Sequence, residues 1–196
     1  MRPIRILAAL ALTLLIAGPA SADEIIEQIQ QAIELYQAGD FAGAAGELEF
    51  AAAQIRQLRA GELSGALPEP LAGWTADDVE TAAMGAAMFG GGTSASRSYS
   101  QDSANVDVQI LTDSPMLQSL AMMLNNPMIL SGSGQKLVRV EGNKAALEWD
   151  GDSGAVNVVV MGSVLVTVSG NDCTEDDLMG YAKAVDYKLI KEMMAR

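Results

Sequence analysis

Apolar residues recur every three or four positions in two stretches near the start of the chain. The first stripe consists of Ile26, Ile29, Ile33 and Tyr36. The second consists of Phe41, Ala44, Leu48, Ala51, Ile55 and Leu58. This spacing places each set on one face of an α-helix. Gly39 is suited to end the first helix, and Asp40 is a suitable N-cap for the second. The pattern predicts a helical hairpin over residues 23–60, in which small alanines let the helices approach closely.

Over about residues 29–58 this hairpin resembles a single tetratricopeptide-type repeat, in the order helix A, turn, helix B. The resemblance is carried by Ala32, Leu35-Tyr36, Gly39-Asp40-Phe41, Ala44-Ala45 and Leu48. No second copy follows, and such repeats need neighbours to form a stable array. The single copy must therefore bury its stripe on the rest of the chain or on another molecule. We expect the rest of the chain to cover it.

Residues 61–78 are predicted to be a linker, because glycines and prolines interrupt regular structure there. The interrupting residues are Gly61, Gly65, Pro68, Pro70 and Gly73. We expect Leu67, Leu71 and Trp74 to attach this linker to the core.

Alternating apolar and polar residues in the second half of the chain predict strands that are buried on one face. They lie at Ala95–Ser100, Val106–Ile110, Val138–Val140, Lys144–Trp149, Ala155–Met161 and Val164–Ser169. Gly142-Asn143 and Gly162-Ser163 are the predicted turns between the later strands. We expect the last four strands to form an antiparallel meander. The earlier hairpin joins it through a crossover with a short helix near residues 114–126.

A final helix is predicted from Thr174, because Asp177 follows three residues later in a pattern close to a capping box. Its buried stripe would be Leu178, Ala182, Val185, Leu189 and Met193. Residues 79–196 are therefore predicted to be an antiparallel α+β domain whose sheet is covered by helices on one face. From about Leu67 onward the order of elements is similar to the PsbP-type fold, in topology alone. That resemblance implies a fold and no particular function.

The first 22 residues are typical of a signal peptide. Arg2 and Arg5 precede an apolar run over 6–17, and Ala20-Ser21-Ala22 fits a small-x-small cleavage site. We expect cleavage after Ala22 and a periplasmic or secreted product that is soluble. No later apolar stretch is long enough to span a bilayer, so we expect no membrane insertion after cleavage.

Composition narrows the partners and the chemistry. The chain has 12 Lys and Arg against 25 Asp and Glu, and two of the arginines lie in the predicted signal. This acidic balance repels nucleic acid and anionic lipid, so we expect neither as a partner. The chain contains no histidine, the usual base for a serine or cysteine nucleophile, and we therefore predict that it is not an enzyme. Cys173 is the only cysteine, so no intramolecular disulfide can form.

Three further patterns invite a chemical interpretation, and a structural one is favoured for each. Asp150-Gly151-Asp152 begins like a calcium loop but lacks the remaining ligands, so we predict a turn. Gly90-Gly91-Gly92 lacks the lysine and following helix of a phosphate-binding loop, so a loop or bulge is expected. Cys173 has acidic neighbours that should raise its pKa, so an inert thiol is expected.

Methionines are the remaining candidates for a binding site. Met116, Met122, Met123 and Met128 cluster around the crossover helix and would form an adaptable apolar surface for a protein partner. Two alternatives remain: these residues pack in the core, or methionine thioethers bind a metal such as copper. We assign no cofactor and no metal.

Two functions fit these observations. The first is a non-catalytic accessory or interaction protein of the bacterial periplasm, whose partner is unidentified. The second is a carrier of a small molecule or metal, with a pocket between the helices and the sheet that includes Met84, Met88 and Met122. An exposed apolar patch would favour the first, and a closed methionine-lined pocket the second.

Overall fold

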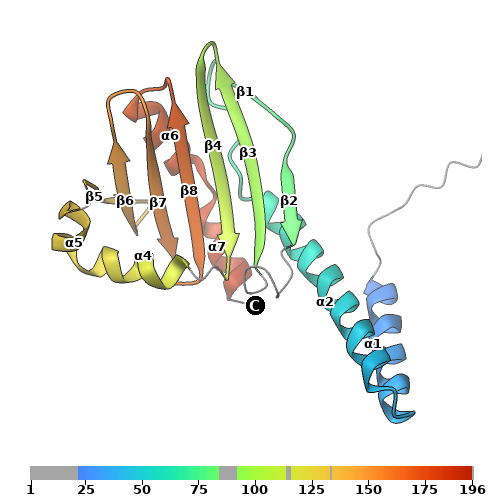
Figure 1. Cartoon of the computed structure of the whole chain (residues 1–196). Helices are drawn as coiled ribbons and strands as arrows, with labels where there is room; N and C mark the ends of the chain where they lie inside the picture. The colour runs from blue at the N-terminus through green and yellow to red at the C-terminus, as the bar shows by residue number, and fades with distance from the viewer. Residues whose placement is uncertain (1–21, 84–91, 114–115, 133, 196) are drawn as a thin grey trace, which may run out of the picture. The chain divides into compact units, whose positions relative to one another are not determined.

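A computed structural model of the chain describes residues 22–83, 92–113, 116–132 and 134–195 (Figure 1). The helices are α1 (Ala22–Gln37), α2 (Phe41–Ser64), α4 (Met116–Asn125), α5 (Pro127–Gly132), α6 (Glu175–Ala184) and α7 (Tyr187–Met194). The strands are β1 (Thr75–Ala76), β2 (Glu80–Ala83), β3 (Thr93–Gln101), β4 (Ala104–Thr112), β5 (Lys136–Val140), β6 (Asn143–Trp149), β7 (Gly154–Val160) and β8 (Val164–Asn171). The chain divides after Leu48, within α2, into two compact units.

The first unit contains α1, the turn and the first part of α2 of the predicted helical hairpin. Gly39 adopts a positive φ of 84° after α1, a conformation that costs glycine little. The Asp40 side chain accepts a 2.9 Å hydrogen bond from the Gly43 amide, as expected of an N-cap. Between the helices, the Gln28 amide group donates to the Glu47 carboxylate. The sequence thus predicted both helices and the turn that joins them.

The second unit is built on an antiparallel sheet, which confirms the α+β fold class. Its described strands run in the order β1-β3-β4-β8-β7-β6-β5, and β2 also pairs with β3. The last four strands form the predicted meander, and the β3–β4 hairpin joins it through the pairing of β4 with β8. The α4 and α5 helices lie in the crossover between β4 and β5, where a short helix was expected.

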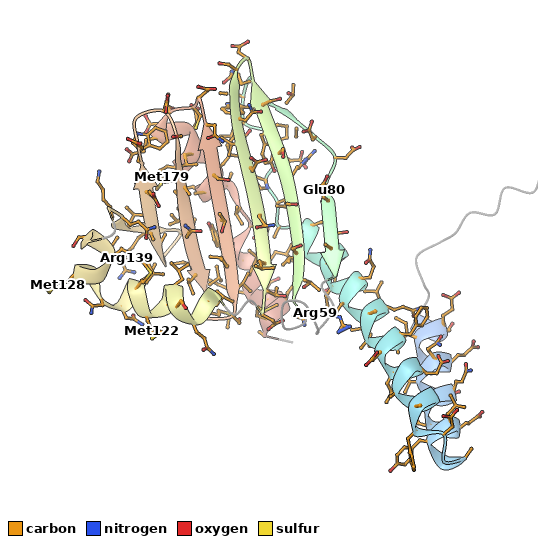
Figure 2. All side chains as sticks on the ribbon, in the orientation of Figure 1. Arg59, Glu80, Met122, Met128, Arg139 and Met179 are labelled. Carbon is orange, nitrogen blue, oxygen red and sulfur yellow. The ribbon has the colours of Figure 1, made fainter. Side chains whose placement is uncertain are left out.

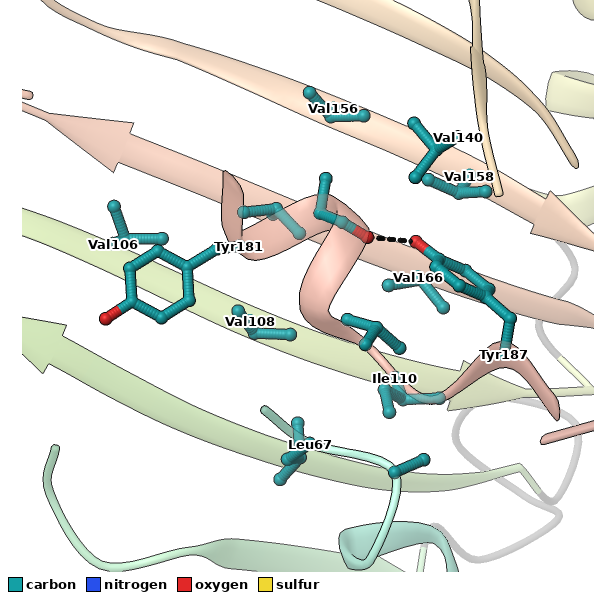
Figure 3. Packing of buried hydrophobic residues seen from close by; sticks show 14 of the residues in the cluster. Leu67, Val106, Val108, Ile110, Val140, Val156, Val158, Val166, Tyr181 and Tyr187 are labelled. Atoms are coloured by element: carbon teal, nitrogen blue, oxygen red, sulfur yellow. Dashed lines mark hydrogen bonds between the residues drawn. The ribbon is translucent and has the colours of Figure 1, made fainter. Parts of the chain in front are cut away.

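The core lies between the sheet and the two C-terminal helices (Figure 3). Val156, Val158 and Val160 of β7 pair in register with Val168, Val166 and Val164 of β8, and all six are fully buried. Alternation of side chains along a strand directs these valines to the same face of the sheet. Above them, the Tyr187 hydroxyl donates a 2.7 Å hydrogen bond to the Ala182 carbonyl, which ties α7 to α6.

The segment predicted as a linker is attached to this core as expected. Leu67 and Trp74 are buried members of the core, and Leu71 packs against it. The segment is more ordered than the sequence suggested, because α2 extends to Ser64 and β1 pairs with β3.

Three local predictions were wrong. The turn between β5 and β6 is formed by Glu141 and Gly142, at φ of 47° and 80°, so it lies one residue before the predicted Gly142-Asn143 pair. Positive φ at both residues gives the twist that a two-residue hairpin requires. The turn after β7 likewise begins earlier, with Met161 and Gly162 at positive φ. In the sequence, Asn125-Asn126-Pro127 also predicts that the crossover helix ends in a loop. Instead a second helix, α5, begins at Pro127, where proline suits a first helical position.

The predicted C-terminal helix is two helices. Thr174 and Asp177 form the complete capping box that begins α6. Val185 then adopts an extended conformation, and the Asp186 side chain caps α7 by accepting a 2.9 Å hydrogen bond from the Leu189 amide. The Asp186 amide donates 3.0 Å to the Ala66 carbonyl, a contact that a continuous helix would not allow. The break buries Tyr187 and Ile190 and leaves Leu189 and Met193 of the predicted stripe only half-buried.

Helices also cover part of the opposite face of the sheet, where only one covered face was predicted. Leu124 of α4 and Leu130 of α5 form a small buried cluster with Ala146 of β6. Ala146 points away from the main core, because its neighbours Ala145 and Leu147 belong to that core. The crossover helices therefore pack on the second face at the β5–β7 end.

Candidate interaction surface

The hairpin exposes the large apolar side chains that were expected to be buried. Ile26 and Ile33 of α1 are 52% and 50% exposed, and Tyr36 is 65% exposed. Phe41 and Leu48 of α2 are 65% and 51% exposed. The packing of α1 on α2 therefore leaves half or more of each of these side chains accessible.

The two helices bury a partly different set of residues, because Ala44 belongs to the predicted stripe of α2 whereas Ile25 and Ala32 lie outside the predicted stripe of α1. Ile25 and Ala32 of α1 and Ala44 of α2 are almost fully buried. Ile25 and Ala32 are seven residues apart, so they share a helix face next to the one that carries Ile26 and Ile33. Small residues on this face allow the backbones to approach closely, and the larger side chains remain at its margin. A sequence signal for the packed face of α2 was the seven-residue spacing of Ala44 and Ala51, which are both almost fully buried.

Exposed apolar residues of the two helices meet at the turn of the hairpin. The rings of Tyr36 and Phe41 meet edge to face, with their centroids 5.4 Å apart at an interplanar angle of 63°. Such a pair is a stable arrangement for aromatic rings. We call this surface the apolar stripe and define it by Ile26, Ile33, Tyr36, Phe41 and Leu48. Contiguous exposed apolar surface of this kind is typical of binding sites.

The part of the hairpin that carries the apolar stripe has acidic residues and no basic ones. Between residues 23 and 48 the sequence contains six carboxylates and no lysine or arginine. Asp23, Glu24, Glu27, Glu34 and Asp40 are exposed. The stripe therefore lies in a negative field that no cation of the same segment offsets.

The predicted methionine surface is only partly exposed. Met122 of α4 and Met128 of α5 are 67% and 84% exposed and point away from the sheet (Figure 2). Met123 is half-buried and packs against the small cluster formed by Leu124, Leu130 and Ala146. Met116 is the first residue of α4, and the structure does not describe its side chain. Met122 and Met128 are accessible to a partner, whereas Met123 is held in packing.

The other candidate chemical groups have structural roles. Cys173 is buried, and burial, followed by the nearby Asp177 carboxylate, raises the pKa of its thiol, as the sequence predicted. Asp150 and Asp152 form the predicted turn around Gly151, which has φ of 78°. Gly90 and Gly91 lie outside the described residues, and a strand begins at Thr93, after the glycines. Within the described ranges, no three His, Cys, Asp or Glu side chains form a group that would hold a metal ion.

The alternative carrier hypothesis predicted a pocket between helices and sheet. Met84 and Met88 lie outside the described residues, and Met122 is exposed on α4. A hollow of about 560 Å³ lies beside α7, where Glu141, Lys188 and Lys191 line its rim. No methionine lines this hollow, which opens on the surface between the C-terminal helices and the β5–β6 turn.

Comparison of the chain with protein-family models, curated proteins and solved structures gave no match. Among the helices that the structure describes, none is long and apolar enough to cross a membrane.

Proposed function

We propose that this chain is an exported, non-catalytic interaction protein of the bacterial periplasm that binds a protein partner through the apolar stripe. The observation that carries the proposal is the exposure of the Tyr36–Phe41 ring pair with Ile26, Ile33 and Leu48 beside it. Roughly half of each side chain is free, and burying that area on a partner would contribute about 1 kcal/mol per residue.

Two features of the sequence support the rest of the proposal. The cationic start, the apolar run and the small residues before Asp23 favour export. The lack of histidine removes the commonest general base and nucleophile activator, which favours binding over catalysis. Met122 and Met128 provide a second exposed apolar area that would extend the interaction surface.

Photo-crosslinking in living cells tests this proposal. The chain is expressed in its host with p-benzoylphenylalanine in place of Phe41, and in a second strain in place of the exposed Gln31. Gln31 is exposed and lies on a different face of α1 from Ile26 and Ile33, so it is a matched control on the same helix. We expect a discrete protein adduct from position 41 and none from position 31. Failure to obtain an adduct from position 41, with the protein correctly folded, would overturn the proposal.

A further inference from the structure

The apolar stripe has the residue spacing of a helix-binding seam. Ile26 and Ile33 are seven residues apart on α1, and Phe41 and Leu48 are seven residues apart on α2. A seven-residue repeat keeps side chains facing a helix that packs alongside. Because Tyr36 and Phe41 are in contact, the two rows meet at the turn and leave a two-helix surface for a third helix.

Carboxylates accompany the seam at the same interval. Glu27 and Glu34 directly follow Ile26 and Ile33, and both are exposed. Glu27 and Glu34 thus occupy positions that flank the seam. In coiled coils, charged residues at such flanking positions select the partner helix by its charge. No cation lies within residues 23–48 to neutralise them.

We propose that the occupant of the apolar stripe is an amphipathic helix of a partner protein that carries lysine or arginine beside its apolar face; this rests on the proposed function above. A basic helix would bury the stripe and place its cations against Glu27 and Glu34. A second copy of this chain would instead bring two acidic hairpins together, and like charges across an interface disfavour binding. The same charges repel an anionic membrane surface.

Fluorescence anisotropy with three model peptides tests the partner class. The labelled peptides are about 18 residues long and share one leucine-rich face, and their polar positions are all Lys, all Gln or all Glu. We expect the purified full chain to bind the Lys peptide at least tenfold more tightly than the Gln peptide and not to bind the Glu peptide. This preference should shrink when the salt concentration rises, because salt screens exposed charges.

Two variants test whether the Lys peptide binds at the apolar stripe or is attracted to the acidic protein in general. Ile33→Ser with Phe41→Ser should weaken Lys-peptide binding at least tenfold, and both positions are exposed, so folding should persist. Glu27→Gln with Glu34→Gln should reduce the preference for Lys over Gln. The control, Glu175→Gln with Asp176→Gln, removes the same charge from the first turn of α6 and should leave that preference intact.

Several results would overturn the inference. The first two are equal binding of the Lys and Gln peptides, and binding of the Lys peptide that the stripe variant leaves unchanged. The third is a dimer in sedimentation equilibrium that the stripe variant abolishes. The fourth is binding of the chain to phosphatidylcholine vesicles that the stripe variant abolishes, when none of the peptides binds. An adduct between position 41 and a different protein, combined with any of these results, would preserve the proposed function and reject only the basic helix.

Discussion

The Tyr99 hydroxyl donates a 2.6 Å hydrogen bond to the carbonyl oxygen of Pro68, and the contact is buried. It joins the segment after α2 to the C-terminal part of β3. The Tyr99 ring also packs against Tyr181 of α6, at a centroid distance of 4.4 Å, and the Tyr181 hydroxyl accepts a hydrogen bond from the Leu71 amide. The two tyrosines thus anchor the same segment from the sheet and from a helix.

Replacing Tyr99 with phenylalanine should destabilise the protein measurably. The substitution keeps the ring but leaves the Pro68 carbonyl buried without this donor, which costs about 1–3 kcal/mol. Chemical denaturation should show that loss in the free energy of unfolding. Tyr36→Phe is the matched control, because Tyr36 is exposed and should change stability by less than about 0.5 kcal/mol. Equal effects of the two substitutions would contradict the role given to this hydrogen bond.

Stability should fall at alkaline pH. Burial raises the pKa of Tyr99 to about 12, and burial also raises the pKa values of Tyr181 and Tyr187. A tyrosine in the unfolded chain ionises near pH 10, so the unfolded state loses its protons first. The stability from these tyrosines is therefore complete below about pH 10 and is lost as the pH rises toward 12.

Denaturation midpoints between about pH 8 and 11.5 measure this decline. The Tyr99→Phe variant should decline less steeply than the parent protein, because it lacks one of the three groups. A parent midpoint that stays constant across this range would show that the tyrosines ionise equally in both states.

The capping box of α6 provides a third prediction. Thr174 Oγ1 accepts a hydrogen bond from the Asp177 amide at 3.1 Å, and the Asp177 carboxylate accepts one from the Thr174 amide at 3.1 Å. Thr174→Ala should lower the free energy of unfolding by about 1 kcal/mol. Asp176→Ala, which removes an exposed carboxylate of the same turn outside the box, serves as the control in parallel urea titrations. A larger loss from the control than from Thr174→Ala would reject the cap as a stabilising element.

Two glycines should respond to alanine with opposite signs. At Gly170 a Cβ atom would lie 2.5 Å from Cys173 Sγ, so Gly170→Ala should destabilise the protein by about 1–3 kcal/mol through overpacking. At Gly61, on the exposed side of α2, a Cβ atom would meet nothing within 4 Å. Gly61→Ala should stabilise the helix by about 0.5–1 kcal/mol, because alanine loses less backbone entropy. Thermal unfolding of both variants measures whether each stabilises or destabilises the protein. If Gly170→Ala is stabilised, the new Cβ atom does not clash with Cys173 Sγ.

The adjacent methionines of α4 should behave differently. Met122 is exposed, so Met122→Ser should leave stability within about 0.5 kcal/mol of the parent protein. Met123 packs against Leu124, Leu130 and Ala146, so Met123→Ser should cost about 1 kcal/mol or more. Denaturation of each single variant measures the difference. If Met122→Ser is the more destabilising change, Met122 is a core residue and is not available to a partner.

Much of the sheet could be predicted from alternation alone. Val156, Val158, Val164 and Val166 recur every second position, and this period predicted strands that bury the same residues the structure buries. Thr174 and Asp177 likewise predicted a helix start, because a capping box acts over four adjacent residues. Such features depend on neighbours in the chain and can be recognised locally.

Features that depend on distant residues could not be predicted in this way. The break at Val185 and Asp186 is stabilised by a hydrogen bond to Ala66, about 120 residues earlier, although the stripe of apolar residues runs through it. The burial of Leu124 depends on Ala146, which α4 reaches only after the crossover has folded over the sheet. Periodicity predicts an apolar face, but it does not identify which surface covers that face.

The sequence by itself therefore determined the helical hairpin, the six longer strands, the start of α6, the α+β class and the lack of basic residues around the apolar stripe, because periodicity, caps and charge are properties of adjacent residues. Only the tertiary structure decided that Ile25, Ala32 and Ala44 are buried while Ile26, Ile33 and Phe41 stay exposed. Both sets of residues have helical spacing and apolar character. The choice between them depends on how closely two helix backbones approach, and that distance exists only once both helices are packed together.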